Sequence, residues 1–186
     1  MTEEANEYIV KLFLESDNYL VTTNKKIRIS HKVNTKKGIQ IHNTPYEIDI
    51  IAIRPKPLDK IIGEVKGWRS GLHKWNFTKL VPKPTNKLQK RSQERMHLIN
   101  DEIFRKSMVK GVENVYGEGF KIVIFCHHIN KKDEKEIKNF AKNENFKIIA
   151  WKEILKRLDE IKDTLAYSNE PITQLLRIQK SLNQQN

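Results

Sequence analysis

Apolar residues recur along this chain at two spacings, and these predict alternating helices and strands. Apolar side chains that return every three to four residues indicate amphipathic helices over residues 4–16, 133–143 and 153–161, and a longer helix capped at 85 or 86 that includes 88–103. Short runs of β-branched and aromatic residues indicate strands over 19–23, 26–30, 39–42, 120–127 and 146–151, with two more within 46–68. This order predicts an α/β fold.

Two segments fall outside the regular pattern. The polar tract 31–38 is expected to form a loop or a hairpin tip. Near the carboxyl end, Pro171 precedes apolar positions at helical spacing, so a terminal helix is expected to begin there. We expect one domain over residues 1–165 and a helical extension over 166–186.

Three charged residues interrupt the apolar runs between residues 46 and 68. Asp49 lies inside the first run, and Glu64 and Lys66 lie inside the second. A carboxylate in the middle of an apolar strand is costly to bury unless a metal ion or a paired cation compensates it. These residues are therefore candidates for function.

The pairing of the two runs decides whether these side chains meet. If the turn centres between Pro57 and Leu58, residues whose numbers sum to 115 lie opposite one another. Asp49 then faces Lys66, and Glu64 lies one diagonal step away, within reach of a converging side chain. A register shift of one residue would turn Asp49 to the opposite face.

Two carboxylates and an ammonium group on one face of a sheet suit phosphodiester hydrolysis. Carboxylate oxygens are ligands that Mg²⁺ prefers, and a bound Mg²⁺ activates water and neutralises phosphate charge. An ammonium group beside it can orient the water, transfer a proton or stabilise developing negative charge. The alternative is an Asp49–Lys66 ion pair across the strands, with Glu64 solvated at a sheet edge.

The segment resembles the signature of the PD-(D/E)xK nuclease superfamily, which has the restriction-endonuclease-like fold. Asp49, a spacer of about fifteen residues and then Glu64-Val65-Lys66 match the pattern, and the local sequence is similar to Holliday-junction resolvases, Mrr-type enzymes and YraN-like proteins. Ile48 stands where the superfamily name has Pro. The resemblance implies a central mixed sheet flanked by helices in the order αβββαβ. It also implies metal ligation by Asp49, Glu64 and the main-chain carbonyl of Val65.

The resemblance suggests two further site residues. Many members carry a Glu on the first helix that points into the active site, and by position this would be Glu7. A polar residue on the helix after the second motif strand often supports the site, for which Gln89 and Gln93 are the candidates. The alternatives are a surface Glu that complements the helix dipole and ordinary Gln residues on a helix surface.

The charge of the chain favours a polyanionic partner. The 186 residues include 35 Lys and Arg against 23 Asp and Glu, a net charge of +12. Much of the excess follows the motif, where basic residues alternate with tryptophans that either stack on bases or anchor a loop to the core. The predicted DNA-binding residues are Trp68, Arg69, Lys74, Trp75, Lys79, Lys83, Lys87, Lys90, Arg91 and Arg95.

Other chemistries find little support. The single cysteine, Cys126, excludes an intrachain disulfide and a multi-cysteine zinc site, and it fits a reducing cytosol. The sequence has no phosphate-binding P-loop, no dinucleotide fingerprint and no nucleophile elbow. The amino-terminal residues are acidic, and no apolar run is long enough to span a membrane, so a cytoplasmic protein is expected.

The sequence therefore predicts a Mg²⁺-dependent DNA endonuclease, with Mn²⁺ as a substitute ion and Lys66 as catalytic base or electrostatic stabiliser. A homodimer is expected, because cutting both strands of a two-fold symmetric substrate calls for two sites. Three alternatives stay open: a structure-selective junction resolvase, a non-catalytic DNA-binding or assembly module with the nuclease fold, and an enzyme that acts on RNA.

Overall fold

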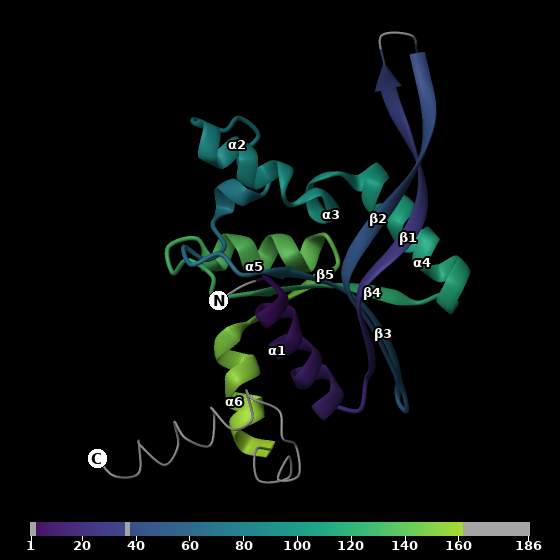
Figure 1. The fold of residues 1–186 in the computed structure, drawn as a ribbon. Coiled ribbons are helices and arrows are strands. Elements are labelled where there is room, and N and C mark those ends of the chain that lie inside the picture. Colours follow the sequence, from purple (N-terminus) through teal and green to yellow (C-terminus); the bar gives the residue numbers. More distant parts are fainter. Residues whose placement is uncertain (1–2, 36–37, 162–186) are drawn as a thin grey trace.

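The computed structural model describes residues 3–35 and 38–161 (Figure 1). The helices are α1 (Glu3–Ser16), α2 (Lys87–Glu94), α3 (His97–Asn100), α4 (Glu102–Tyr116), α5 (Glu134–Asn143) and α6 (Trp151–Ile161), with a 3₁₀ turn, η1 (Lys74–Asn76). The strands are β1 (Leu20–Thr35), β2 (Gly38–Pro55), β3 (Leu58–Lys66), β4 (Phe120–Cys126) and β5 (Phe146–Ala150). The predicted terminal helix and the boundary between residues 165 and 166 lie outside the described residues.

The five strands form one open mixed sheet in the order β1-β2-β3-β4-β5. The pairs β1–β2 and β2–β3 are antiparallel, and the pairs β3–β4 and β4–β5 are parallel. Each parallel pair is joined by a segment that contains at least one helix, as a parallel connection requires. The predicted α/β class and a central mixed sheet flanked by helices are confirmed.

Helices cover both faces of the sheet and enclose two apolar cores. On one face, α1 and α6 pack on β2–β5 through residues such as Val10, Ile50, Phe125 and Leu158. These two helices lie below the sheet in Figure 1. On the other face, α3, α4 and α5 pack through residues such as Ile62, Ile99, Met108, Ile124 and Ile137.

Strands β1 and β2 are much longer than predicted. Their pairing continues to Thr35↔Gly38, so most of the tract predicted as a loop or hairpin tip is strand. β1 is not interrupted at Asn24 as predicted. Asn24 lies within the strand and adopts a backbone φ of +52°. Val21 and Ile27 share the alternation of a regular strand but pack in different cores, so the strand pair twists over near Asn24.

The helix predicted to include residues 88–103 is three separate helices. Between α2 and α3, Met96 leaves helical geometry at φ −109° and ψ 38°. Asp101, at φ −113° and ψ 102°, then begins α4 by accepting a hydrogen bond from the Phe104 amide at 2.9 Å. Met96 is buried as expected, but Leu88 is 69 % exposed because α2 does not lie flat on the sheet.

Candidate active site

The pairing of β2 and β3 differs from the prediction by two residues. The turn is Lys56-Pro57, closed by the pair Pro55↔Leu58, so opposite residues sum to 113 rather than 115. The predicted position of Lys66 opposite Asp49 is therefore wrong. Because side chains alternate with a period of two, a shift of two residues leaves Asp49 on the expected face.

Asp49, Glu64 and Lys66 line one hollow of about 630 Å³ where β2 separates from β3. The last pair of the ladder is Ile50↔Gly63. Beyond it, the Asp49 carboxylate accepts a hydrogen bond from the Val65 amide at 2.7 Å. The Asp49 side chain thus binds a main-chain amide of β3 at the point where the β2–β3 ladder has ended. This hydrogen bond holds the Asp49 carboxylate beside Glu64.

Glu64 and Lys66 form a largely buried ion pair. The Lys66 Nζ lies 2.5 Å from the Glu64 Oε1, and the two side chains are 15 % and 8 % exposed, respectively. The alternative interpretation expected an ion pair between Lys66 and Asp49. Lys66 instead pairs with Glu64. Lys66 also lies 5.8 Å from the centre of the Trp68 ring, which forms part of the wall of the hollow.

The second oxygen of Glu64 fits a cation. Glu64 Oε2 is buried and has no hydrogen-bond partner among the described residues. A buried carboxylate oxygen without a donor is unfavourable, and a divalent ion held by Glu64, Asp49 and the Val65 carbonyl would relieve this. The described part of the chain contains no group of three or more His, Cys, Asp or Glu residues that could hold a metal, so the protein supplies two acidic side chains here. Mg²⁺ commonly binds in this way and keeps several waters.

Helices α2 and α3 supply the basic rim of the hollow. Arg91 and Glu94 of α2 and Arg95, the residue that caps its carboxyl end, line the hollow, followed by His97 of α3. The first three recur at helical spacing and therefore share one side of α2. Both arginines are exposed, and neither forms an ion pair with a carboxylate in the described parts of the chain.

Tyr46 is a site residue that the sequence analysis missed. It lines the hollow from β2 and packs edge-on against Phe104 with 4.8 Å between ring centres. Burial raises the pKa of its hydroxyl well above the ordinary value, and the nearby charges of Glu64 and Asp49 raise this pKa further. The hydroxyl therefore stays protonated and can donate a hydrogen bond. Nothing in the sequence around Tyr46 indicates that it borders a site. By contrast, Arg91, Glu94 and Arg95 recur at helical spacing, which indicates that their side chains share one side of a helix.

The three candidates for supporting residues taken from the family resemblance do not line the hollow. Glu7 accepts a hydrogen bond from the Asn24 side chain at 2.7 Å, next to the twist in β1. Gln93 is buried and donates to the Val81 carbonyl at 2.7 Å, which ties α2 to the preceding loop. Gln89 accepts from the Thr85 amide at the start of α2. All three have structural contacts.

The predicted DNA-binding residues separate into four sets. Trp68, Arg91 and Arg95 line the hollow. Lys74 and Lys79 form ion pairs with Glu136 at 3.2 Å and Glu144 at 2.7 Å, so their charges are partly neutralised. Trp75 stacks on His73 at 4.8 Å, which favours the loop-anchoring role. The others are exposed and form no ion pair within the described ranges: Arg69, Lys83, Lys87 and Lys90.

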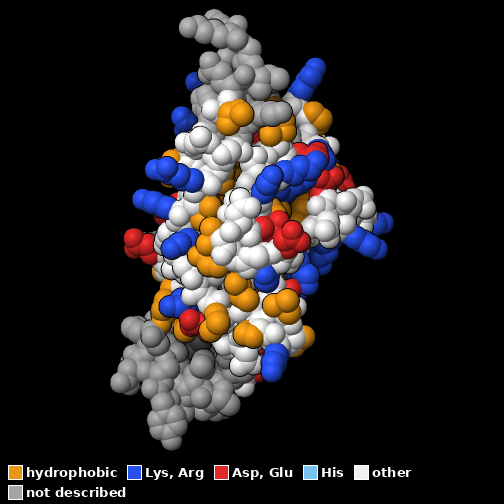
Figure 2. All heavy atoms as spheres, turned by 90° about the vertical axis from the view of Figure 1, so that its right-hand side faces the viewer, with side chains coloured by type: hydrophobic (Ala, Val, Ile, Leu, Met, Phe, Trp, Pro, Cys, Tyr) orange, Lys and Arg blue, Asp and Glu red, His pale blue; other side chains and the backbone are white. Residues whose placement is uncertain are grey.

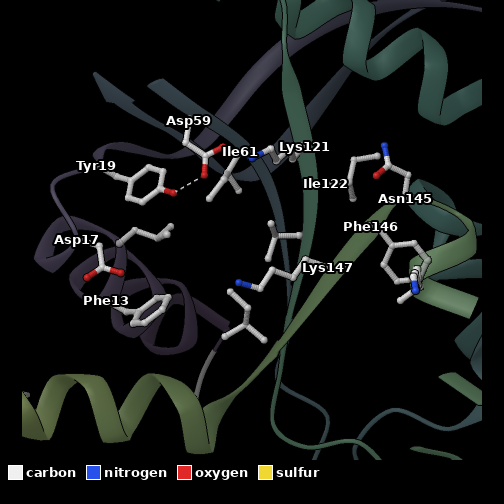
Figure 3. A pocket seen from close by; sticks show the side chains of 15 residues that line it. Phe13, Asp17, Tyr19, Asp59, Ile61, Lys121, Ile122, Asn145, Phe146 and Lys147 are labelled. Atoms are coloured by element: carbon white, nitrogen blue, oxygen red, sulfur yellow. Dashed lines mark hydrogen bonds and ion pairs between the residues drawn. The ribbon is translucent and has the colours of Figure 1, made fainter. Parts of the chain in front are cut away.

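A second hollow, of about 380 Å³, lies on the sheet face covered by α1 (Figure 3). Its carboxylate Asp59 accepts from the Tyr19 hydroxyl at 2.8 Å and pairs with Lys121 at 2.8 Å. Burial acts to raise the pKa of Asp59, but hydrogen bonds from Lys121 and Tyr19 hold that pKa below its ordinary value. Burial and the bond to Asp59 raise the pKa of Tyr19 to about 12. Asp59 Oδ1 also lacks a well-formed hydrogen bond among the described residues, but the Lys121 ammonium lies 2.8 Å from this same oxygen, whereas Lys66 pairs with the other oxygen of Glu64.

Comparisons with known proteins give this chain no relative. No protein-family model matches it, and searches of curated proteins and of solved structures found no match. Among the described residues, no helix has the length and apolar character needed to cross a membrane. The case for function therefore depends on the site itself and on the motif resemblance.

Proposed function

We propose that this chain is a Mg²⁺-dependent DNA endonuclease with a restriction-endonuclease-like core. The observation that carries the proposal is the convergence of Asp49, Glu64 and Lys66 in one hollow. Two more features support it: the unpartnered buried Glu64 oxygen and the exposed arginines on the rim. The order of elements, αβββ followed by helices, β4, α5 and β5, agrees with the αβββαβ order of the resembled superfamily.

In this proposal each side chain has a distinct task. Asp49 and Glu64 hold the ion together with the Val65 carbonyl. When bound, Mg²⁺ (or Mn²⁺) supplies an activated water and neutralises charge on the phosphate. Lys66 places a positive charge where negative charge develops or accepts the proton of the attacking water.

The rim residues bind the substrate backbone. Arg91 and Arg95 are exposed cations beside the acidic pair, so they can contact the phosphates that flank the scissile bond. The protonated Tyr46 hydroxyl can donate a hydrogen bond to a phosphate oxygen. These contacts read charge and geometry rather than base sequence, and they act on any DNA that reaches the hollow.

A cleavage assay tests the proposal. Supercoiled plasmid, a four-way junction and a single-stranded oligonucleotide are each incubated with Mg²⁺, Mn²⁺ or EDTA. We expect metal-dependent nicking that falls at least about 100-fold in Asp49→Ala and in Lys66→Ala, because each substitution removes a group that acts on the transition state. DNA binding should largely persist in both variants, and Lys152→Ala, an exposed lysine on α6, is the matched control.

The other outcomes separate the alternatives. DNA binding without cleavage under every metal would contradict the enzyme and favour a non-catalytic DNA-binding module. Paired symmetric nicks in the junction alone would favour a resolvase. Equal cleavage in the wild-type protein and Asp49→Ala would place the chemistry elsewhere.

A further inference from the structure

The outer part of the β1–β2 pair is a two-stranded ribbon. Pairing between β2 and β3 ends at Ile50↔Gly63, whereas β1 and β2 stay paired from Lys25↔Ile48 to Thr35↔Gly38. At about 3.3 Å per residue this ribbon is roughly 35 Å long, close to one turn of B-DNA at about 34 Å. In Figure 1 it rises above the sheet, on the same side as α2.

The two sides of the ribbon differ in character. Ile27 and Ile29 are buried and belong to the core that includes α4, where Gly111 lets the helix approach: a Cβ there would lie 3.1 Å from Ile29. On the other side, Lys26, Arg28 and Ser30 are exposed. Their partners across the ribbon, Glu47, Pro45 and Asn43, are exposed as well. The ribbon is thus held by α4 on one side and leaves its polar side open.

The ribbon is basic. Between residues 25 and 48 the sequence has six lysines and arginines and a single acidic residue, Glu47. Of these, the structure describes the side chains of Lys25, Lys26, Arg28 and Glu47. Glu47 lies 3.7 Å from Lys26, but both side chains are well exposed, so this pair is weak. Arg28 forms no ion pair with any carboxylate that the structure describes. Figure 2 views the right-hand side of the molecule in Figure 1, where Lys and Arg side chains project at several places between apolar, acidic and other polar groups.

The ribbon is also continuous with the candidate active site. Tyr46 pairs with Ile27 on the side of the ribbon that faces α4, opposite to Lys26 and Arg28, and it lines the hollow that contains Glu64. The ribbon therefore joins the wall of the hollow, while its open polar side faces away from that wall. On the other side of the hollow, α2 adds Arg91 and Arg95.

We propose that this ribbon binds in the major groove of duplex DNA and so holds the duplex on the chain that carries the hollow. The major groove, about 12 Å wide, admits a two-stranded β-ribbon. Lys26 and Arg28 contact the phosphates that border the groove, and the polar Ser30–Asn43 pair faces the base edges. This inference rests on the proposed function, since it names duplex DNA as the substrate class of the same site.

Binding measurements in EDTA test the ribbon without any chemistry. The variant Lys26→Ala/Arg28→Ala removes two exposed charges, and Lys135→Ala/Lys152→Ala removes two exposed charges from α5 and α6. For a 30-base-pair duplex, loss of two phosphate contacts should lower affinity roughly 10- to 100-fold and reduce the slope of log affinity against log salt by about 1.8. The α5/α6 control should bind as the wild-type protein does, and matching thermal unfolding midpoints would show that both variants are folded.

Two further readouts locate the contact. Glu47→Gln removes the only acidic group of the ribbon, so it should strengthen duplex binding. The wild-type protein should protect guanine N7 atoms of the major groove from dimethyl sulfate, and the ribbon variant should lose this protection. An unchanged salt slope, or equal weakening on duplex and single-stranded DNA, would overturn the inference and leave the lysines as protection of an edge strand. Cleavage by the wild-type protein is scored separately, so the two proposals can fail independently.

Discussion

At the residue scale, the candidate site is built on an unfavourable arrangement. Glu64 and Lys66 are both largely buried, and one Glu64 oxygen has no donor among the described residues. Desolvation of two charges often exceeds their mutual attraction. Residues that serve chemistry rather than folding are expected to lower the stability of the folded protein in this way.

The free energy of unfolding, measured in EDTA, tests whether this ion pair destabilises the protein. Lys66→Met alone leaves the Glu64 charge buried without its cation and should lower the free energy of unfolding by about 3 kcal/mol. Glu64→Leu/Lys66→Met removes both charges, and its free energy of unfolding should equal or exceed that of the wild-type protein, by up to about 4 kcal/mol. Urea denaturation provides the values. A double variant that is less stable than the wild-type protein would show that the ion pair is a net stabilising contact.

Sequence alone predicted the residues whose chemistry conflicts with their surroundings. Asp49, Glu64 and Lys66 are charged residues within apolar runs, and such a conflict is visible without a structure. Tyr46 is an ordinary aromatic residue of a strand, so its place in the hollow depends on how β2 twists. Glu7 was expected from resemblance alone, and its contact with Asn24 depends on a backbone conformation that the sequence does not specify.

At the element scale, the turn between β2 and β3 limited how well the strand register could be predicted. The sequence shows two prolines between the strands but not which residues close the turn, and this produced the two-residue error in register. The predicted grouping of Asp49 with Glu64 and Lys66 was unaffected, because a register error of two residues leaves each side chain on the same face of the sheet. The division of the helix predicted to include 88–103 was missed for a related reason: Asp101 caps α4, but an Asp within a helical pattern does not by itself reveal a break.

Helix α2 offers a test of how an element positions the basic rim. Asn86 caps this helix, and its side chain accepts from the Gln89 amide at 2.9 Å. Asn86→Ala should lower the free energy of unfolding by about 1 kcal/mol and weaken DNA binding, because Arg91 and Arg95 lose a firm helical support. Asn86→Ser keeps a capping hydroxyl and is the matched control. Equal DNA affinity in the two variants would mean that α2 does not need its cap to place the arginines.

At the scale of the whole molecule, basic surfaces flank the acidic pair of the candidate site. The ribbon and α2 stand on the same side of the sheet in Figure 1, and the hollow with Asp49 and Glu64 lies where β2 leaves β3. In the second hollow, the Asp59 carboxylate pairs with the Lys121 ammonium and accepts a hydrogen bond from the Tyr19 hydroxyl. Under the proposed function, one chain therefore cuts one strand, and a double-strand break requires two chains.

The number of chains in each cut can be counted from kinetics. We propose a homodimer on duplex DNA, so at low protein concentration the rate of linear plasmid formation should rise more steeply with concentration than the rate of nicking. Mixing wild-type protein with an excess of Asp49→Ala should form mixed dimers that retain one working hollow. Such mixtures should still nick plasmid but make little linear product, as gel analysis of both products would show. If linear product instead rises in proportion to wild-type protein and is insensitive to Asp49→Ala, one chain cuts both strands in turn, and the dimer has no role in cleavage.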